Sequence, residues 1–410
     1  MKIRDYQPDR DKVAAHRIWR EVGWVEEKRH EEAMDVFLSG SRALVAEIEG
    51  DAECLVCSVE GEIRYLDASL PMSCVTGVTT SRVARKQGLA ARTTAKGIAC
   101  DAADGAILAA LGIFEQGFYD QLGFGCGGYE HWCTFDPARL AIDLPLRVPR
   151  RIGEADWEAV HASRLARLHG HGTCDLLAPE VTRAELGWAT NGFGLGYCDG
   201  PKGELTHHLW ATAKEAESGP YTVQWMSYRT REQFHELMGL LRGFGDQVCS
   251  IKLREPQGVQ FQDLLRQPFR TRQMTRNSQH ESRMNASAYW QTRILDLPGC
   301  LARTVLEGDP VLFNLVLKDP IVPFLPEDAP WRGVAGAYVV TLGPESSAVD
   351  GRDAVLPTLT ATVGAFTRMW LGVRPATGLA WTDCLEGPEG LLVDLDRILR
   401  IPEPKPDWDL

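Results

Sequence analysis

The chain has 410 residues, which is room for two or three domains. Hydrophobic residues make up 44% of it and charged residues 24%, an ordinary composition for a soluble globular protein. The formal net charge of −12 argues against a nucleic-acid-binding protein, because such proteins need basic surface to neutralise phosphates. The acidic balance mildly favours a cationic partner, although many proteins are this acidic without one.

The sequence contains 11 cysteines, an odd number. Cys54 and Cys57 form a lone C-x-x-C, and no second pair follows at zinc spacing; in a strand their side chains point to opposite faces. We therefore expect reduced thiols in a cytoplasmic protein. Residues 1–6 lack the apolar segment of a signal peptide, and no run of about 18 apolar residues occurs, so we expect no membrane association.

The first 145 residues alternate between strand-like and helix-like patterns, as in α/β proteins. In chain order, the predicted elements are a strand (1–6), an amphipathic helix (11–25), a hairpin (43–48 with 54–59), a strand (74–80), a helix (88–103) and a buried strand (106–111).

Two prolines, Pro145 and Pro149, mark a predicted linker. Strand and helix patterns return beyond it, without a second phosphate-binding loop: a strand (221–228), a helix (231–241) and a strand (247–253). From about residue 285 the pattern changes again, to strands at 288–297, 311–318 and 336–342 and a last helix at 391–399. Alternate prolines in residues 402–406 favour a stiff, extended tail, although chain ends are also where fraying concentrates.

A short basic segment follows the predicted strand at 74–80. Residues 85–90 read Arg-Lys-Gln-Gly-Leu-Ala and lead into a predicted helix. Such a segment suits a pyrophosphate, because Gly88 lets backbone amides approach closely at a helix N-terminus, while Arg85 and Lys86 add positive charge. A basic turn that caps a helix has the same pattern, so the motif is weak by itself.

About thirty residues after Gly88 comes Tyr119, in a Tyr-x-x-x-Gly-Phe pattern. A tyrosine hydroxyl at a reaction centre can act as a general acid. The alternative is a core aromatic residue packed beside Phe118.

Together, the strand, the basic loop and the segment 118–125 (Phe-Tyr-Asp-Gln-Leu-Gly-Phe-Gly) resemble the GNAT superfamily, and within it the enhanced-intracellular-survival (Eis-type) N-acetyltransferases. Residues 289–298 resemble the start of that family's third domain. The resemblance implies an α/β (α+β) fold of tandem GNAT-like domains followed by a sterol-carrier-protein-like α/β domain. The implied ranges are a catalytic GNAT domain (1–145), a second GNAT-like domain without a CoA site (146–285) and the sterol-carrier-protein-like domain (286–410), whose C-terminal tail reaches the active site.

The resemblance also implies acetyl-CoA as co-substrate. Backbone groups of Val78 and Thr80 would meet the pantetheine arm. The pyrophosphate would be held by four residues of the loop and the helix start: Arg85, Lys86, Gly88 and Leu89.

Two groups carry the chemistry that the resemblance implies. Tyr119 would protonate the leaving thiolate, and the terminal carboxylate of Leu410 would be the general base. Four positions depart from the family's pattern: Arg82 stands where a proline is common, Thr80 where valine is usual, Phe114 where a small polar residue is common, and Leu410 where the last residue is usually aromatic.

The implied function is acetyl-CoA-dependent transfer of an acetyl group directly to an amine, such as an aminoglycoside-like polyamine or a lysine amine of a peptide. The implied assembly is a homo-oligomer, a hexamer or a trimer. A rival reading is a protein that binds a lipid or another small ligand and carries a degenerate acetyltransferase fold.

We expect no metal site. The histidine pairs His169/His171 and His207/His208 have no third ligand at helical spacing, and loop histidines often occur in such pairs.

Overall fold

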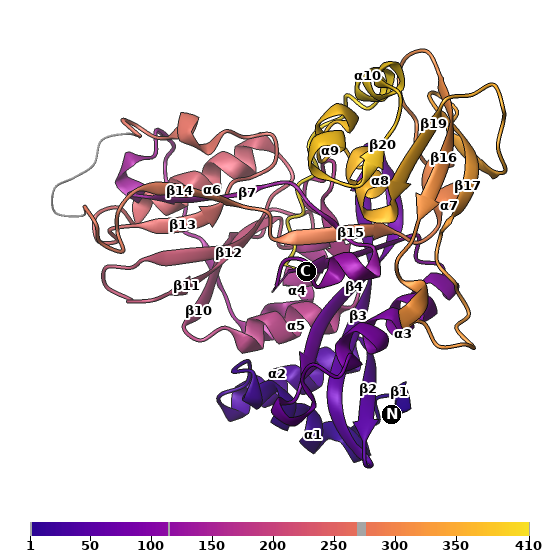
Figure 1. Ribbon diagram of the computed structural model, residues 1–410. Helices are drawn as coiled ribbons and strands as arrows, with labels where there is room; N and C mark the ends of the chain where they lie inside the picture. Colours follow the sequence, from indigo (N-terminus) through magenta and orange to yellow (C-terminus); the bar gives the residue numbers. More distant parts are fainter. Residues whose placement is uncertain (1, 114, 269–275, 410) are drawn as a thin grey trace. The chain divides into compact units, whose positions relative to one another are not determined.

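Segments from both ends of the chain combine in one compact unit. The computed structural model describes residues 2–113, 115–268 and 276–409. Unit 1 comprises Met1–Gly128, His171–Ala178 and Ala288–Leu410, and unit 2 comprises Tyr129–Gly170 and Pro179–Ser287 (Figure 1). Strand β7 (Glu130–Phe135), which we expected within the first domain (1–145), pairs in unit 2. The division into three consecutive domains stays a prediction.

The larger sheet of unit 1 has the strand order β1-β2-β3-β4-β5-β15-β6, with β9 also paired to β3. Its strands are β1 (Lys2–Asp5), β2 (Arg42–Ile48), β3 (Asp51–Tyr65), β4 (Ala68–Thr80), β5 (Leu108–Gly112), β6 (Gly125–Cys126), β9 (Cys174–Leu176) and β15 (Trp290–Ile294). Among the described strands of this sheet, β4 and β5 are the pair that runs parallel, and the other pairs are antiparallel. In Figure 1 the orange strand β15 lies among purple segments, because it inserts between β5 and β6.

Helices pack on both faces of this sheet: α1 (Pro8–Glu21), α2 (Lys28–Ser39) and α3 (Leu89–Ala103). Successive residues of β3 point to opposite faces. Val56 joins a buried cluster formed with α3, whereas Cys57 lies beside Trp19 of α1 at Gly77. None of the helices in the described ranges is long and apolar enough to cross a bilayer.

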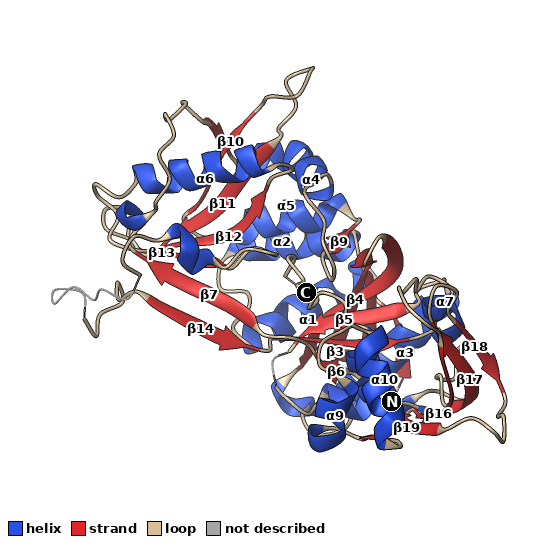
Figure 2. Ribbon diagram, turned by 90° about the horizontal axis from the view of Figure 1, so that it is seen from above, coloured by secondary structure: helices blue, strands red, loops and turns tan. Residues whose placement is uncertain are grey.

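A smaller sheet completes unit 1, with the order β18-β17-β16-β19-β20. Its strands are β16 (Val311–Lys318), β17 (Gly336–Leu342), β18 (Ser347–Asp350), β19 (Thr358–Thr362) and β20 (Leu385–Glu386). The accompanying helices are α7 (Leu297–Leu301), α8 (Val363–Trp370), α9 (Ala376–Thr382) and α10 (Glu389–Ile398); Figure 2 shows α9 and α10 near β16 and β19. The predicted strands at 311–318 and 336–342 are confirmed; a sterol-carrier-protein-like identity for this part stays a prediction.

Unit 2 has one sheet, ordered β14-β7-β13-β12-β11-β10-β8. Besides β7, its strands are β8 (Arg150–Ile152), β10 (Gly192–Tyr197), β11 (His207–Ala213), β12 (Tyr221–Ser227), β13 (Ile251–Arg254) and β14 (Arg283–Ser287). Helix α6 (Arg231–Gly243) buries Phe234 and Leu237 in one cluster on the sheet. A second cluster contains Val160 of α4 (Trp157–Leu165) and Leu186 of α5 (Pro179–Trp188).

Candidate active site

Strands β4 and β5 pair over only part of their length. The parallel register runs from Met72 opposite Leu108 to Cys74 opposite Ala110. Beyond Cys74, β4 continues to Thr80 with β3 on one edge, and no described strand covers its other edge. The backbone groups of residues 75–80 on that edge are therefore available to an extended ligand, in the way that a free strand edge accepts a further strand.

A β-bulge lies in this part of β4. The register with β3 shifts between Leu55 and Cys57, and Gly77 opposite the shift has φ +63. A side chain there would be strained, and its Cβ would lie 3.2 Å from both Cys57 Sγ and Trp19 Cζ2. A bulge bends the strand and redirects the neighbouring backbone groups. Val78, predicted to contact CoA through its backbone, directly follows it.

The basic loop connects β4 to α3 through one 3₁₀ turn, Arg82–Ala84. Both Lys86 (φ +62) and Gly88 (φ +75) are left-handed, and Gly88 is the N-cap of α3. The Arg82 backbone amide donates to Glu21 Oε2 at 2.6 Å, a bond that the family's usual proline could not make. The departure at Arg82 therefore has a local structural reason.

The first turn of α3 leaves its amides free. The first backbone bond of the helix runs from Arg92 N to Gly88 O, no side chain caps the helix, and the amides of Leu89 to Ala91 donate to no other described residue. Arg85, Lys86 and Gly88 are exposed beside them. Free amides at a helix N-terminus and adjacent cations form a site for a phosphate group.

The loop residues differ in what they can offer. The side chain of Leu89 is buried in the core, so only its backbone amide can face a ligand. A Cβ on Gly88 would meet no atom within 4 Å, so the space in front of the loop is open. The side chain of Thr80 is already engaged, because its Oγ1 donates to Cys54 Sγ at 3.5 Å. Any contact of Thr80 with a ligand would therefore come from its backbone groups.

Tyr119 begins a 3₁₀ turn, Tyr119–Leu122, and only 7% of it is exposed. Its ring lies against Phe118 and Phe124, and it belongs to the same buried cluster as Cys54 and Leu89. Burial, and to a lesser extent Cys54, raises its pKa to about 12. Its hydroxyl makes no hydrogen bond to another described residue, and its ring shares a buried cluster with Val75 of β4 and Leu89 of α3.

A distant strand holds the turn that carries Tyr119. Arg293 of β15 is fully buried, donates from Nη1 to the carbonyl of Leu122, and pairs through Nη2 with Asp319 at 2.6 Å. Gln291 of the same strand donates to Asp120 Oδ1 at 2.8 Å. Sequence reasoning missed both contacts, because nothing local indicates that residues about 170 positions away fix this turn.

The tail is docked on unit 1 rather than frayed. The Lys405 amide donates to His171 O at 3.1 Å, and Asp407 accepts from the Cys174 amide at 3.3 Å. Trp408 is only 2% exposed. Because Cys174 opens β9 and β9 pairs with β3, the tail is attached to the sheet that contains β4.

Two predicted positions lie outside the described residues. These are Leu410, expected to supply the catalytic base, and Phe114, a departure from the family's pattern. The described tail ends at Asp409, directly before Leu410.

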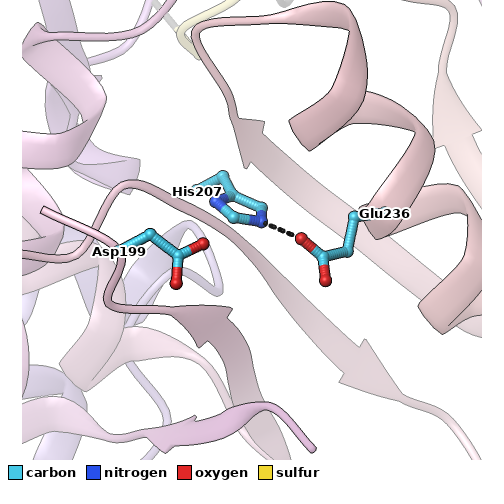
Figure 3. A group of neighbouring side chains, drawn as sticks. All are labelled: Asp199, His207 and Glu236. Carbon is cyan, nitrogen blue, oxygen red and sulfur yellow. Dashed lines mark hydrogen bonds and ion pairs between the residues drawn. The ribbon is translucent and has the colours of Figure 1, made fainter. Parts of the chain in front are cut away.

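A histidine and two carboxylates converge in unit 2 (Figure 3). One potential ligand atom from each of Asp199, His207 and Glu236 lies within 4.8 Å of the others. His207 Nε2 is 2.9 Å from Glu236 Oε2. Arg147 donates to both carboxylates, at 2.5 Å to Glu236 and 2.7 Å to Asp199, and its hydrogen bonds lower the pKa of each. The Arg147 guanidinium already supplies a positive charge to the two carboxylates, so the cluster is an ion-pair network. A metal ion would have to compete with Arg147 for the same carboxylate oxygens.

No family model and no curated protein matches the sequence. Solved structures match the whole fold. A probable N-acyltransferase from Enterococcus faecalis V583 has a TM-score of 0.79 at 16% identity, covering 100% of this chain and 99% of that one. A GCN5-related N-acetyltransferase from Anabaena variabilis has 0.78 at 12%, covering 100% of both chains. Eis1 from Mycobacterium abscessus has 0.76 at 15%, also covering 100% of both chains.

These likenesses span both units and the tail, and the expected resemblance to Eis-type proteins is confirmed at the level of the fold. The matched region includes the diverging strands β4 and β5, the basic loop and the Tyr119 turn. Over its whole length, the chain has the fold of GCN5-related N-acetyltransferases.

Proposed function

We propose that the protein is an acetyl-CoA-dependent N-acetyltransferase that transfers the acetyl group directly to an amine. The observation that carries the proposal is the open edge of β4 leading into the uncapped N-terminus of α3, with the protonated Tyr119 in the same cluster. A thioester cofactor with a pyrophosphate needs an extended backbone edge and an anion site in this order. The fold shared with N-acetyltransferases supports the same assignment.

In the proposed complex, the pantetheine arm lies along residues 78–80 and pairs with the backbone of Val78 and Thr80. The pyrophosphate lies at the amides that begin α3, with Arg85 and Lys86 beside it. The backbone amide of Val78 donates to the thioester carbonyl and stabilises the oxyanion that forms as the amine attacks.

Tyr119 donates the proton that the leaving sulfur needs. A free tyrosine has a pKa near 10, and burial raises that of Tyr119 to about 12, so the phenol keeps its proton throughout the neutral range. As the C–S bond breaks, negative charge develops on sulfur and the hydroxyl hydrogen bonds to it. The proton then passes to the thiolate, which leaves as CoA thiol.

The attacking amine must also lose a proton, and we propose the carboxylate of Leu410 as its acceptor. The docked tail supports this role, because a chain end can act as a base only where it is fixed. Trp408 is buried and Asp407 is bound to Cys174, so the chain is held up to two residues before that position.

The primary test measures binding and turnover separately. Calorimetry with CoA is expected to show one site per chain. A thiol-release assay with acetyl-CoA and a panel of amines, including aminoglycosides and lysine-containing peptides, is expected to show transfer to at least one class. Absence of CoA binding would overturn the proposal and favour the rival, a protein that binds another small ligand.

The role of the tail has its own test. Two residues appended after Leu410 are expected to reduce turnover by roughly 10²–10⁴-fold, the usual contribution of a general base, with CoA affinity unchanged. The same two residues placed before Met1 serve as the control. Full activity of the C-terminally extended protein would transfer the base to a side chain near Tyr119.

Three finer expectations remain proposals with the function. They are a polycationic or lysine amine as acceptor, a sterol-carrier-protein-like fold for the β16–β20 region, and assembly into a trimer or hexamer in the cytoplasm. Light scattering at micromolar concentration tests the assembly, since a monomer there would refute it.

A further inference from the structure

The turn that carries Tyr119 is too short to hold itself in place. It is a single 3₁₀ turn, Tyr119–Leu122. Two backbone bonds follow it, from the Gly123 amide to the Asp120 carbonyl at 2.9 Å and from the Phe124 amide to the Tyr119 carbonyl at 3.2 Å. One turn of helix is unstable alone, because few hydrogen bonds offset the entropy lost in forming it. Contacts with other segments must therefore set the position of the Tyr119 hydroxyl.

Strand β15 binds this turn at two places. Gln291 and Arg293 are two residues apart, so their side chains leave the same face of the strand. Gln291 Nε2 donates to Asp120 Oδ1 at 2.8 Å, near the start of the turn. Arg293 Nη1 donates to the Leu122 carbonyl, at its end. A turn held at two points cannot rotate or slide along the strand without losing one of these bonds.

Arg293 is itself fixed by Asp319. Both side chains are 0% exposed, and Arg293 Nη2 donates to Asp319 Oδ2 at 2.6 Å. Backbone amides hold this carboxylate, since Val334 donates to Oδ2 at 3.0 Å and Ile321 donates to Oδ1 at 3.2 Å. The guanidinium therefore bridges a fixed carboxylate and the Leu122 carbonyl through two separate nitrogens. A lysine ammonium is a single point charge on a flexible stem and cannot reproduce this bridge.

Gly123 brings the end of the turn into direct contact with this ion pair. Its φ is +81, and a Cβ there would lie 2.9 Å from Arg293 Nη1 and 3.2 Å from Asp319 Oδ1. A third atom, Val363 Cγ1, would be 2.5 Å away. These distances leave no room for a side chain, so the backbone of the turn packs directly on the pair. A shift of the pair would therefore be passed on to the turn.

Stability alone is a poor explanation for these buried polar groups. Gln291 Oε1 and Arg293 Nε are buried and have no hydrogen-bond partner among the residues that the structure describes. Unmatched buried polar atoms are costly, and a buried ion pair is often no more stable than apolar residues of similar volume. Apolar residues at positions 291 and 293 would avoid that cost, but they could not bind the turn.

We propose that Gln291 and Arg293, the latter fixed by Asp319, are positioning residues that hold the Tyr119 hydroxyl at the leaving sulfur. The proposal rests on the function proposed above, in which the O–H bond of Tyr119 breaks as the S–H bond of CoA forms. The phenolate then regains a proton from solvent. Proton transfer needs hydrogen-bond distance, and a misplacement of about 1 Å can cost on the order of 10²-fold in rate.

The kinetic test is a double-mutant cycle with Tyr119→Phe in the full-length protein, followed as thiol release from acetyl-CoA. Arg293→Lys keeps a charge beside Asp319 but removes the bridge, and kcat is expected to fall about 10–100-fold with CoA affinity unchanged. In the Tyr119→Phe chain the same change is expected to lower kcat less than about twofold, because no acid is left to misplace. A merely structural role would lower kcat by the same factor in both chains.

Further variants guard against misfolding. Gln291→Met removes the other contact and is expected to give a smaller loss of kcat that also disappears in the Tyr119→Phe chain. If Arg293→Lys does not fold, Arg293→Met combined with Asp319→Asn replaces it, since this combination leaves no buried charge without a partner. Arg164→Lys is the matched control, because it changes a buried arginine that pairs with Glu185 in unit 2, and it is expected to leave kcat unchanged.

A spectroscopic measurement separates this proposal from the proposed function. In protein labelled with ¹³Cζ-tyrosine, the NMR signal that disappears in Tyr119→Phe identifies Tyr119. Arg293→Lys and Gln291→Met are expected to shift or broaden that signal without any substrate, and Arg164→Lys is expected to leave it in place. An unmoved signal, or an equal loss of kcat in both chains, would overturn the positioning role. A moved signal in a protein that transfers no acetyl group would refute the proposed function and leave the anchoring of Tyr119 by β15 standing.

Discussion

Both units contain a strand, a helix and a parallel strand, yet the start of the helix is capped by a side chain in unit 2 and uncapped in unit 1. In unit 1 the element order is β4, α3, β5, and in unit 2 it is β12, α6, β13. Each first strand outruns its parallel partner: β12 pairs with β13 only at Tyr221 and Thr222 and continues to Ser227. The two units therefore share the diverging strands and differ in the connection.

The connection decides whether the helix start is free. In unit 2 only residues 228–230 precede α6; Thr230 accepts from the Gln233 amide at 3.3 Å, and Gln233 Oε1 accepts from the Arg229 amide at 2.7 Å. In unit 1 the longer loop 81–88 ends in left-handed Gly88, with no side-chain cap. In α6 the Thr230 side chain therefore occupies one of the amide donors that a phosphate would use. We therefore expect the loop to decide whether this strand–helix–strand unit can bind a ligand.

The largest expected effect on turnover concerns Tyr119, the proposed general acid. Tyr119→Phe removes one hydroxyl from unit 1 and is expected to lower kcat for acetyl transfer by about 10²–10⁴-fold with CoA affinity nearly unchanged, because the leaving thiolate loses its proton donor. The measurement is steady-state thiol release together with calorimetry. The matched control in unit 2 is Tyr197→Phe, a buried tyrosine whose hydroxyl makes only a 3.4 Å bond to Arg147 O. Unchanged turnover in Tyr119→Phe would reduce Tyr119 to a packing residue.

The next effect concerns the loop. Gly88→Leu places a side chain in the open space before α3, and we expect CoA affinity to fall by about 100-fold, close to 2.7 kcal/mol. Gly203→Leu in unit 2 is the control, since Gly203 has φ +79 and is equally open. Both variants carry a left-handed non-glycine residue and should lose similar stability, about 1–2 kcal/mol. Equal CoA affinity in the two variants would place the cofactor elsewhere.

A smaller effect concerns charge. Arg85→Gln with Lys86→Gln removes two exposed cations from the loop, and CoA affinity is expected to fall about tenfold at low salt. The loss should shrink as ionic strength rises, because salt screens exposed charges. Replacing Arg231 and Arg242 of α6 with glutamine gives the comparison in unit 2. A loss that does not depend on salt would mean that the two side chains act through the loop's conformation.

The smallest effect concerns the capped helix. Thr230→Ala removes the cap of α6 and is expected to cost about 1 kcal/mol of stability, measured by urea unfolding. CoA stoichiometry should stay at one per chain. A second CoA site in this variant would show that the cap alone had blocked unit 2.

The sequence was informative where the signals are local. The apolar segment at 74–80, Gly88 and the predicted helix at 88–103 correspond to the end of β4 and to α3. The predicted strand boundaries were too short where pairing extends a strand. The prediction was 54–59, but β3 runs from Asp51 to Tyr65, because β4 and β9 supply partners along its length. Helix α2 went unrecognised, although Ala33, Met34, Phe37 and Leu38 follow helical spacing and form its buried face together with His30.

The features that the sequence could not predict are contacts between residues far apart in the chain. Nothing around Arg293 indicates that its guanidinium holds the Tyr119 turn, and nothing around Gln291 indicates its bond to Asp120. The pattern at 288–297 suggested a strand, but a strand's hydrophobic pattern does not name its neighbour. The tail's contacts with His171 and Cys174 join three distant parts of the chain in the same way.

The insertion of β15 between β5 and β6 also constrains how the protein is made. During synthesis, residues 1–128 leave the ribosome long before residues 290–294. The edge of β5 and the Tyr119 turn therefore lack β15 during that time. Contacts of such high sequence separation slow folding, because a long loop must close before they form. The nascent N-terminal part therefore exposes an unpaired strand edge until most of the chain has been translated. A fragment truncated near residue 145 should consequently be poorly folded and prone to aggregation, however well its own motifs are preserved.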